Sequence, residues 1–344
     1  MKKICLLVFL ACFGLFTNQS IFAQAFAKVG TVGAQFLEIG VGARAIGMGE
    51  AFAAVADDAT SIFWNPAGMT RVAEKAIFIS HTDWVLDIRQ ESVAYVQNLD
   101  LRGSVGVFLS LFSLGEFDGQ NIYGQGETFT PQYFYGGVSY AKMLTDKFSF
   151  GVNLKGVRQD FDVQDNSNSN ISAQNWAVDL GSLYNTGWKS LRIGMSVFHF
   201  GPELTPSGKY DDFENNDLNP AREKEFKPYD LPLTFRVGLA MEVIEKEDRR
   251  LTVAFDWTHP NDNLEKVHLG GEFTLSDLLV LRGGYKLVSA EPSLITPKNY
   301  DHEGFNAGAG FLLSMGETKL NLDYGFADFN RLTDVHRVSV GYSF

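Results

Sequence analysis

Short segments in which apolar residues alternate with small or polar ones recur from residue 76 to residue 344. In residues 319–326 the even-numbered positions hold Leu, Leu, Tyr and Phe, and the odd-numbered positions hold Lys, Asn, Asp and Gly. Successive side chains of a β-strand point to opposite faces, so this pattern is typical of a strand with one face on lipid and the other on a polar lumen. Fourteen such segments predict an all-β fold, a 14-stranded antiparallel transmembrane β-barrel.

The expected strand starts also predict which barrel end faces which side of the membrane. An even strand count puts both barrel termini at one end, and periplasmic turns are short while extracellular loops are long. Connections after even-numbered strands are short, whereas the four longest (114–130, 162–174, 201–232 and 288–304) all follow odd-numbered strands. The termini are therefore expected in the periplasm. The fourteen strands are expected to begin near Ala76, Glu91, Arg102, Pro131, Phe148, Asn175, Leu191, Leu233, Arg249, Glu265, Leu278, Phe305, Thr318 and Thr333.

Residues 1–23 have the features of a secretory signal peptide. Lys2 and Lys3 precede an apolar run over residues 4–16, and a small-residue region follows, with cleavage expected after Ala23 or Ala25. The run is too short to be a spanning helix. It predicts Sec-type export followed by insertion into a bacterial outer membrane. Both cysteines of the chain lie within these residues, so no disulfide or thiolate metal site is expected in the mature protein.

Composition adds little to this picture. The net charge of −12 suits an ordinary acidic globular protein, but a barrel with a polar lumen also has unremarkable averages. Residues 40–45 (GVGARA) fit a dinucleotide-binding fingerprint, yet the required strand before and helix after are missing from the pattern. The six histidines are scattered, and no Ser/His/Asp arrangement stands out. We therefore expect no catalytic residues, no metal, no cofactor and no nucleic-acid partner.

Residues 26–75 differ from the rest because they are rich in Gly and Ala and do not alternate. Roughly 50 such residues before a barrel are about the size of a plug, and small residues allow a backbone to pack closely inside a lumen. Glycines at expected inward positions of the wall match this arrangement: Gly106, Gly151, Gly194, Gly238, Gly284 and Gly308. The chain is thus divided into a signal peptide, an N-terminal hatch (26–75) within the lumen and a barrel (76–344).

Charged residues in the expected hatch are candidates for ion pairs. Arg44 with Asp57 or Asp58 is either a latch that opens or a static pair that holds the hatch, and the static pair is favoured because buried charges need partners in any case. The expected inward face of the wall is charged as well, which suits a plugged lumen better than a continuous apolar channel. Its charged positions are Lys155, Asp179, Arg236, Asp256, Arg282, Asp323 and Arg337.

Two short motifs in residues 26–75 resemble a known family. The run ADDAT at 56–60 followed by Asn65, Pro66, Ala67 and Gly68 resembles the hatch motif of the FadL superfamily of outer-membrane transport proteins. The run GARAIGMG at 42–49 is similar to the PorV/PorQ branch of that superfamily. The resemblance covers about 35 residues and implies a hatch inside the barrel. The Asn65–Gly68 motif is then either an element that rearranges to open a path or a structural turn fixed by its proline.

Two further regions are candidates for partner binding. The 201–232 loop carries Gly201, Pro202, Glu203, Asp211, Asp212 and Pro232, a composition of solvated surface in which a partner site is a second interpretation. The terminal aromatics Tyr342 and Phe344 are expected to face lipid and to be read by the barrel-insertion machinery.

Three functions follow as hypotheses. The PorV/PorQ resemblance implies a role in type IX secretion, in which the barrel takes exported cargo or secretion-system proteins as partners and shuttles cargo to a surface attachment complex. The FadL resemblance implies passage of long-chain fatty acids or other hydrophobic ligands. The third is a structural barrel in outer-membrane lipid without transport.

Overall fold

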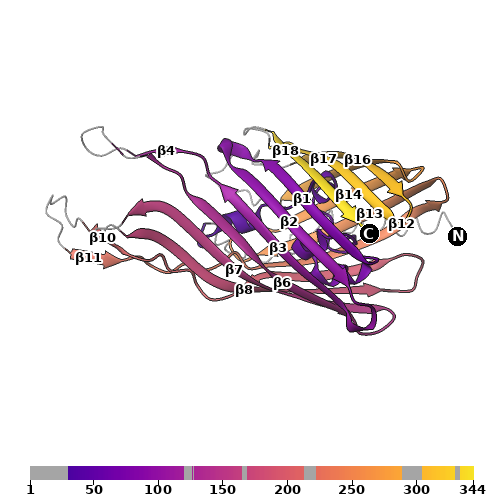
Figure 1. The fold of residues 1–344 in the computed structure, drawn as a ribbon, viewed down its shortest axis with the longest axis horizontal. Helices are drawn as coiled ribbons and strands as arrows, with labels where there is room; N and C mark the ends of the chain where they lie inside the picture. The colour runs from indigo at the N-terminus through magenta and orange to yellow at the C-terminus, as the bar shows by residue number, and fades with distance from the viewer. Residues whose placement is uncertain are drawn as a thin grey trace, which may run out of the picture.

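Fourteen strands form a closed antiparallel barrel in the computed structural model, which describes residues 30–119, 126, 128–164, 169–212, 222–288, 304–329 and 334–344. Neighbours along the chain pair with each other, and β1 pairs with β18 to close the ring (Figure 1). The barrel strands are β1 (Lys75–Asp83), β2 (Arg89–Asn98), β3 (Ser104–Ser113), β6 (Gln132–Met143), β7 (Phe148–Gln164), β8 (Asn170–Asn185), β9 (Arg192–Phe200), β12 (Thr234–Lys246), β13 (Arg249–Pro260), β14 (Lys266–Leu275), β15 (Leu279–Val288), β16 (Phe305–Met315), β17 (Thr318–Ala327) and β18 (Val335–Ser343).

The prediction of fourteen strands is confirmed, and only one strand start is clearly misplaced. β8 begins at Asn170 rather than near Asn175, and β7 continues to Gln164, so the expected 162–174 loop is wrong. Here β7 and β8 pair beyond an irregularity, with Gln164 opposite Asn170. The sequence pattern does not reveal this part of the two strands, because many of its residues are polar. Neither lipid nor lumen imposes an alternating pattern there.

The two barrel ends differ in their connections, and we call them the short-turn end and the long-loop end. Two additional hairpins lie in long connections, one formed by β4 (Phe117–Asp118) and β5 (Thr128–Phe129), the other by β10 (Lys209–Asp212) and β11 (Arg222–Glu225). Both project from the same end of the barrel, opposite the C-terminus (Figure 1). Single 3₁₀ turns, η3 (Val85–Asp87) and η4 (Asp100–Arg102), connect β1 to β2 and β2 to β3.

The barrel wall is apolar outside and polar inside. In β3 buried and exposed residues alternate without a break, with Val107 and Leu109 facing out and Ser104 and Ser110 facing in. All seven charged wall residues predicted to face inward are buried. Within the described part of the chain, no helix has the length and apolar character needed to span a bilayer.

Residues 30–74, which we call the N-terminal segment, lie within the barrel. They form short turns only: η1 (Gln35–Glu38), α2 (Ala43–Gly47), α3 (Ser61–Trp64) and η2 (Pro66–Arg71). α2 packs against β15 to β18, and η2 packs against β6 to β8 on another part of the wall. Between these helices the residues of 51–56 (AFAAVA) are almost completely buried.

Wall glycines allow this close contact. A Cβ added to Gly151 would lie 2.4 Å from the carbonyl carbon of Pro66, and one added to Gly284 would lie 2.2 Å from the amide nitrogen of Gly49. All six wall glycines predicted to face inward would place a Cβ within 3.1 Å of the N-terminal segment. The predicted close packing of a small-residue segment against wall glycines is therefore confirmed.

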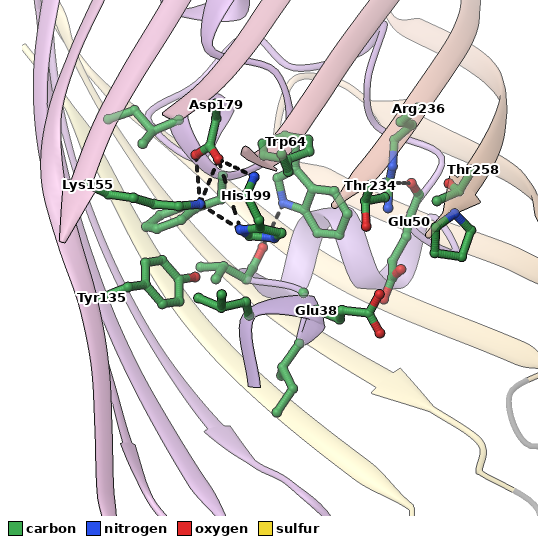
Figure 2. Close-up of a pocket in the computed structure, with 18 of the residues that line it drawn as sticks. Glu38, Glu50, Trp64, Tyr135, Lys155, Asp179, His199, Thr234, Arg236 and Thr258 are labelled. Atoms are coloured by element: carbon green, nitrogen blue, oxygen red, sulfur yellow. Dashed lines mark hydrogen bonds and ion pairs between the residues drawn. The ribbon is translucent and has the colours of Figure 1, made fainter. Parts of the chain in front are cut away.

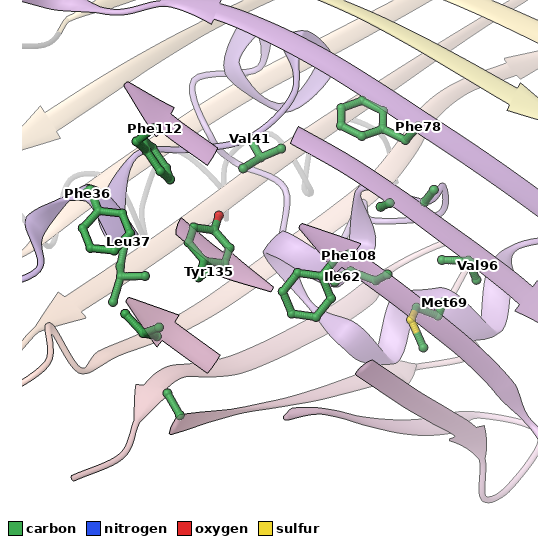
Figure 3. Close-up of a cluster of buried hydrophobic side chains, with 14 of the residues drawn as sticks. Phe36, Leu37, Val41, Ile62, Met69, Phe78, Val96, Phe108, Phe112 and Tyr135 are labelled. Atoms are coloured by element: carbon green, nitrogen blue, oxygen red, sulfur yellow. The ribbon is translucent and has the colours of Figure 1, made fainter. Parts of the chain in front are cut away.

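An apolar cluster runs along the lumen beside the N-terminal segment. Figure 3 shows Phe36 and Leu37 at one end of it and Met69 and Val96 at the other. Phe36 packs edge-on against Phe112 with ring centroids 5.1 Å apart, a contact of a kind that contributes about 0.5–1.5 kcal/mol beyond its buried area. The segment is therefore attached to the wall by apolar packing on the β2 to β8 side.

Candidate functional site: the filled lumen

Arg44 joins two parts of the N-terminal segment to each other and to the barrel wall. Its α2 helix follows Gly42, whose φ of 91° favours glycine. The guanidinium Nη1 lies 2.6 Å from Asp57 Oδ1 and 2.7 Å from Asp58 Oδ2, so the structure brings these three residues together. Nε and Nη2 donate to the two carboxylate oxygens of Glu272 on β14, at 2.8 and 2.9 Å. This fork-to-fork geometry is the strong form of an arginine–carboxylate pair.

Further charges extend this contact into a network. Arg282 on β15 donates to Glu272 Oε2 at 2.7 Å and to Asp323 on β17 at 2.6 Å. Within the segment, Arg71 Nη2 lies 3.4 Å from Asp57 Oδ2. Burial alone would raise the pKa of Asp57, but the charges of Arg44 and Arg71 outweigh it and lower that pKa below its ordinary value. The two arginines therefore hold the Asp57 carboxylate in its charged form.

A second contact between segment and wall surrounds Glu50. Its carboxylate lies 2.7 Å from Lys286 Nζ, and its backbone carbonyl accepts a 2.9 Å hydrogen bond from Arg236. The ring Nδ1 of His268 lies 2.9 Å from the neighbouring Gly49 carbonyl. Burial acts to raise the pKa of Glu50, and Lys286 together with the other nearby positive charges lowers it further than burial raises it.

Asp256 fixes the next part of the segment. It is fully buried, and its Oδ2 accepts hydrogen bonds from the Phe52 and Ala53 amides at 3.0 and 2.8 Å. Arg236 lies 3.8 Å from the same carboxylate and stacks on the Trp64 ring at 4.9 Å. Backbone amides of residues 52–53 thus find their acceptor on the wall rather than within the segment.

The Asn65–Gly68 motif forms a completely buried turn. Asn65 Nδ2 donates to the Ala53 carbonyl at 2.7 Å and to the Ser182 carbonyl of β8 at 2.9 Å, while its Oδ1 accepts from the Ala67 amide. Pro66 occupies the first position of η2, where its missing amide hydrogen costs nothing. A Cβ on Gly68 would lie 2.5 Å from the Ala56 carbonyl oxygen. The motif thus ties two parts of the segment to the wall.

A cavity of about 90 Å³ lies between residues 37–41 and residues 62–64 of the segment. It reaches the long-loop ends of β9, β12, β13 and β14, where its lining includes Phe198, Thr234 and Thr258. On one side Lys155 Nζ contacts Asp179 at 2.7 Å and His199 Nδ1 at 2.8 Å (Figure 2). The cavity wall is therefore partly apolar and partly made of paired charges.

A second cavity, of about 450 Å³, opens among the turns of the other end and is lined by Arg44, Asp57, Asp58 and Arg71. Residues 51–56 line neither cavity and are almost completely buried. The N-terminal segment therefore contributes lining residues to both cavities.

The residues predicted for the 201–232 loop do not form one site. The Glu203 carbonyl accepts a hydrogen bond from Asn175 at 2.8 Å, and the Pro232 carbonyl accepts one from Thr234 at 3.1 Å, so both ends of the loop are fixed at the barrel rim. Gly201 packs so closely on β8 that a Cβ would lie 2.5 Å from the Trp176 carbonyl oxygen. Pro202 follows it in the chain, whereas Asp211 and Asp212 belong to the projecting hairpin strand β10.

At the other end of the chain, Tyr342 and Phe344 stack with ring centroids 5.2 Å apart, and Lys75 Nζ lies 5.5 Å from the Phe344 ring. The backbone amides of Phe344 and Lys75 each donate a hydrogen bond to the other residue's carbonyl. These aromatics therefore lie at the seam between the first and last strands.

Sequence reasoning missed Glu50, His199, Glu272 and Lys286. Glu272 and Lys286 occupy inward positions of clearly alternating strands, so the pattern could have identified them. His199 could not be placed, because a bulge in the β8–β9 pairing and a φ of 64° shift it out of register. Among the described residues, no group of three or more His, Cys, Asp or Glu side chains could hold a metal ion.

A family model described as "Type IX secretion system protein PorV" matches residues 22–259, more than half of the chain. The chain belongs to the PorV family. A search of curated protein sequences gave no match. Membership of this family and the closed barrel place the chain among outer-membrane transport and secretion proteins.

Solved structures share the fold. The "CymD monoaromatic hydrocarbon channel" is 13% identical over 89% of this chain and 98% of its own, with a TM-score of 0.57. The Pseudomonas putida toluene transporter TodX is 12% identical over 88% and 97%, with a TM-score of 0.57. A Pseudomonas aeruginosa FadL homologue is 12% identical over 88% and 98%, also with a TM-score of 0.57. These likenesses confirm the FadL-like barrel fold that the resemblance implied.

Proposed function

We propose that this chain acts in type IX secretion as a plugged barrel that receives exported cargo at its long-loop end and passes it to a surface attachment complex. The filled lumen carries this proposal. A cavity of about 90 Å³ has room for roughly three water molecules, whereas an α-helix is about 10–12 Å across. Cargo must then bind outside the lumen.

The 201–232 loop is the cargo contact that we propose, because it projects from the end where the connections are longest. Lys209 and Glu223 of the β10–β11 hairpin have side chains 53% exposed, so a partner can reach them. The ends of the loop at Gly201 and Pro232 are anchored at the rim, which presents the hairpin on a rigid base.

Passage of hydrophobic small molecules is the second candidate, favoured by the apolar residues Leu37, Ile39 and Phe198 that line the cavity. TodX and CymD, which share the fold, are named for toluene and monoaromatic hydrocarbons. The cavity is smaller than the roughly 150 Å³ that accommodates benzene in a protein core. Passage therefore requires the N-terminal segment to act as a hatch, with the Arg44 contacts as its latch and the Asn65–Gly68 turn as its moving element.

Delivery to the membrane belongs to the same proposal. Residues 1–23 lie outside the described residues and are proposed to direct Sec-type export. The exposed terminal Phe344 beside Tyr342 is the signal that the insertion machinery would read.

The test is deletion of the gene with complementation by the wild-type chain. Loss of surface-attached cargo from the surface proteome, with unchanged uptake of a labelled long-chain fatty acid, is the expected result. Unchanged surface cargo would overturn the secretion role. Reduced uptake with unchanged cargo would establish the second candidate, and no change in either would leave a structural barrel.

A further inference from the structure

Residues 33–39, which we call the lid, form the part of the N-terminal segment nearest the long-loop end. Three of them, Leu37, Glu38 and Ile39, line the 90 Å³ cavity (Figure 2). On another face Phe36 packs among Phe112 and Tyr133 of the wall, with ring centroids 5.1 and 5.2 Å away. The lid thus forms one side of the cavity at the long-loop end.

The 201–232 loop holds the start of the lid. The Gly33 amide donates a 3.1 Å hydrogen bond to the Asp230 carbonyl. The Tyr229 ring lies directly on Gly33, since a Cβ there would be 2.2 Å from ring carbon Cδ2. Gln35 Nε2 adds a 2.5 Å hydrogen bond to Asp262, which follows β13.

Tyr229 is itself part of a fixed pair within the loop. The backbone amides of Leu204 and Tyr229 each donate a hydrogen bond to the other residue's carbonyl, at 2.9 and 3.0 Å. The Tyr229 hydroxyl donates to Gln159 of β7 at 2.6 Å. Leu204 is completely buried in the same apolar cluster as Phe36. The loop therefore has an inner part packed on the lid and an outer part, the β10–β11 hairpin, in solvent.

We propose that the lid is a gate that narrows the mouth of the cavity and that the 201–232 loop holds it in this position through Tyr229 and Asp230. Displacing the Leu204–Tyr229 pair removes the ring that covers Gly33 and the carbonyl that accepts its amide. A partner that binds the displaced form of the loop more tightly than the form seen here would shift the equilibrium of the lid toward its open position. The size of that shift is set by the difference between the two affinities. The coupling goes beyond the proposed secretion role and does not depend on which partner binds.

The test is the alkylation rate of a thiol placed in the cavity at Thr258→Cys, whose side chain is buried beneath the lid. A membrane-impermeant reagent is applied to the folded barrel, and modification is measured peptide by peptide, so the chain's own Cys5 and Cys12 do not contribute. In this background Tyr229→Ala is expected to raise the rate at least tenfold. Tyr229→Phe, which keeps the ring on Gly33 and loses only the hydroxyl, is expected to change it less than threefold.

A matched control distinguishes lid opening from general loosening. Thr274→Cys is equally buried but lines the cavity at the short-turn end, so its rate should not respond to Tyr229→Ala. Gly33→Ala offers an independent perturbation, because its new Cβ collides with the ring while the loop stays intact. Equal rates for Tyr229→Ala and wild type at the Thr258→Cys thiol, or a parallel rise at the Thr274→Cys thiol, would overturn the proposal.

Discussion

Replacing Arg44 with methionine tests whether the charge network holds the N-terminal segment in place. Arg44→Met keeps much of the side-chain volume and removes the charge that contacts three carboxylates. Glu272, whose side chain is 4% exposed, then retains Arg282 as its charged partner, while Asp57 and Asp58 lose their closest one. The α2 helix should release more readily from β14.

The expected size of the effect follows from burial. Removing one partner of a buried pair costs about 3–5 kcal/mol because the other charge remains buried. Asp57 and Asp58 are 33% and 24% exposed and are partly solvated after the change, so the lower end applies, about 3 kcal/mol. Since about 1.4 kcal/mol is a factor of ten, local opening of α2 should become roughly 10²-fold more frequent.

Hydrogen exchange of α2 and of residues 51–56, measured on the barrel in detergent, gives this opening directly. Arg158→Met is the matched control, because its pair with Asp160 spans 3.5 Å with side chains 39% and 35% exposed, and such surface pairs contribute about 0–1 kcal/mol. Protection of α2 within threefold of wild type in Arg44→Met would refute the reasoning. Equal loss in both variants would show that the effect does not come from the network.

Three further outcomes are expected. Gly284→Val should displace the segment and increase solute flux in liposome swelling, because a Cβ would lie 2.2 Å from the Gly49 nitrogen; Gly283→Val, which faces outward with nothing within 4 Å, should not. Asn65→Ala should lower the free energy of local opening of residues 51–56 by about 1–3 kcal/mol, because the buried Ala53 carbonyl loses its hydrogen-bond donor. Unchanged exchange protection of these residues would show that the Asn65 side chain does not hold them in place. The lowered pKa of Asp57 means that its contribution to stability is present above the unfolded value of about 3.9 and is lost as pH falls through the folded value. The protection factor of α2, which is the intrinsic exchange rate divided by the observed rate, should therefore decrease below about pH 4, and Asp57→Asn should flatten that response.

The wall was predictable because lipid and lumen impose a period of two on every spanning strand. Gly151 and Gly284 were expected to face the N-terminal segment for the same reason, and both do. Where a strand extends beyond the membrane, the alternation is no longer required. For this reason the sequence pattern assigns the first residues of β8 to a loop.

The partners within the lumen were harder to predict. Arg44 and Glu272 are 228 residues apart, and only the closed ring brings β14 against α2. Candidate charges can be identified from alternation, but their pairing depends on which strands stand opposite the segment. The charge pattern favoured a plugged lumen without indicating that Glu50 and Glu272 connect the N-terminal segment to the wall.

The seam between β1 and β18 has a consequence for assembly order. Lys75 follows the N-terminal segment directly and pairs with Phe344, so the ring closes only when β18 pairs with β1. The segment contacts late strands such as β14 and β17, and its residues 51–56 are almost completely buried. We therefore expect the wall to assemble around the segment. On this view, the residues that fill the lumen serve first as the internal template on which the late strands dock.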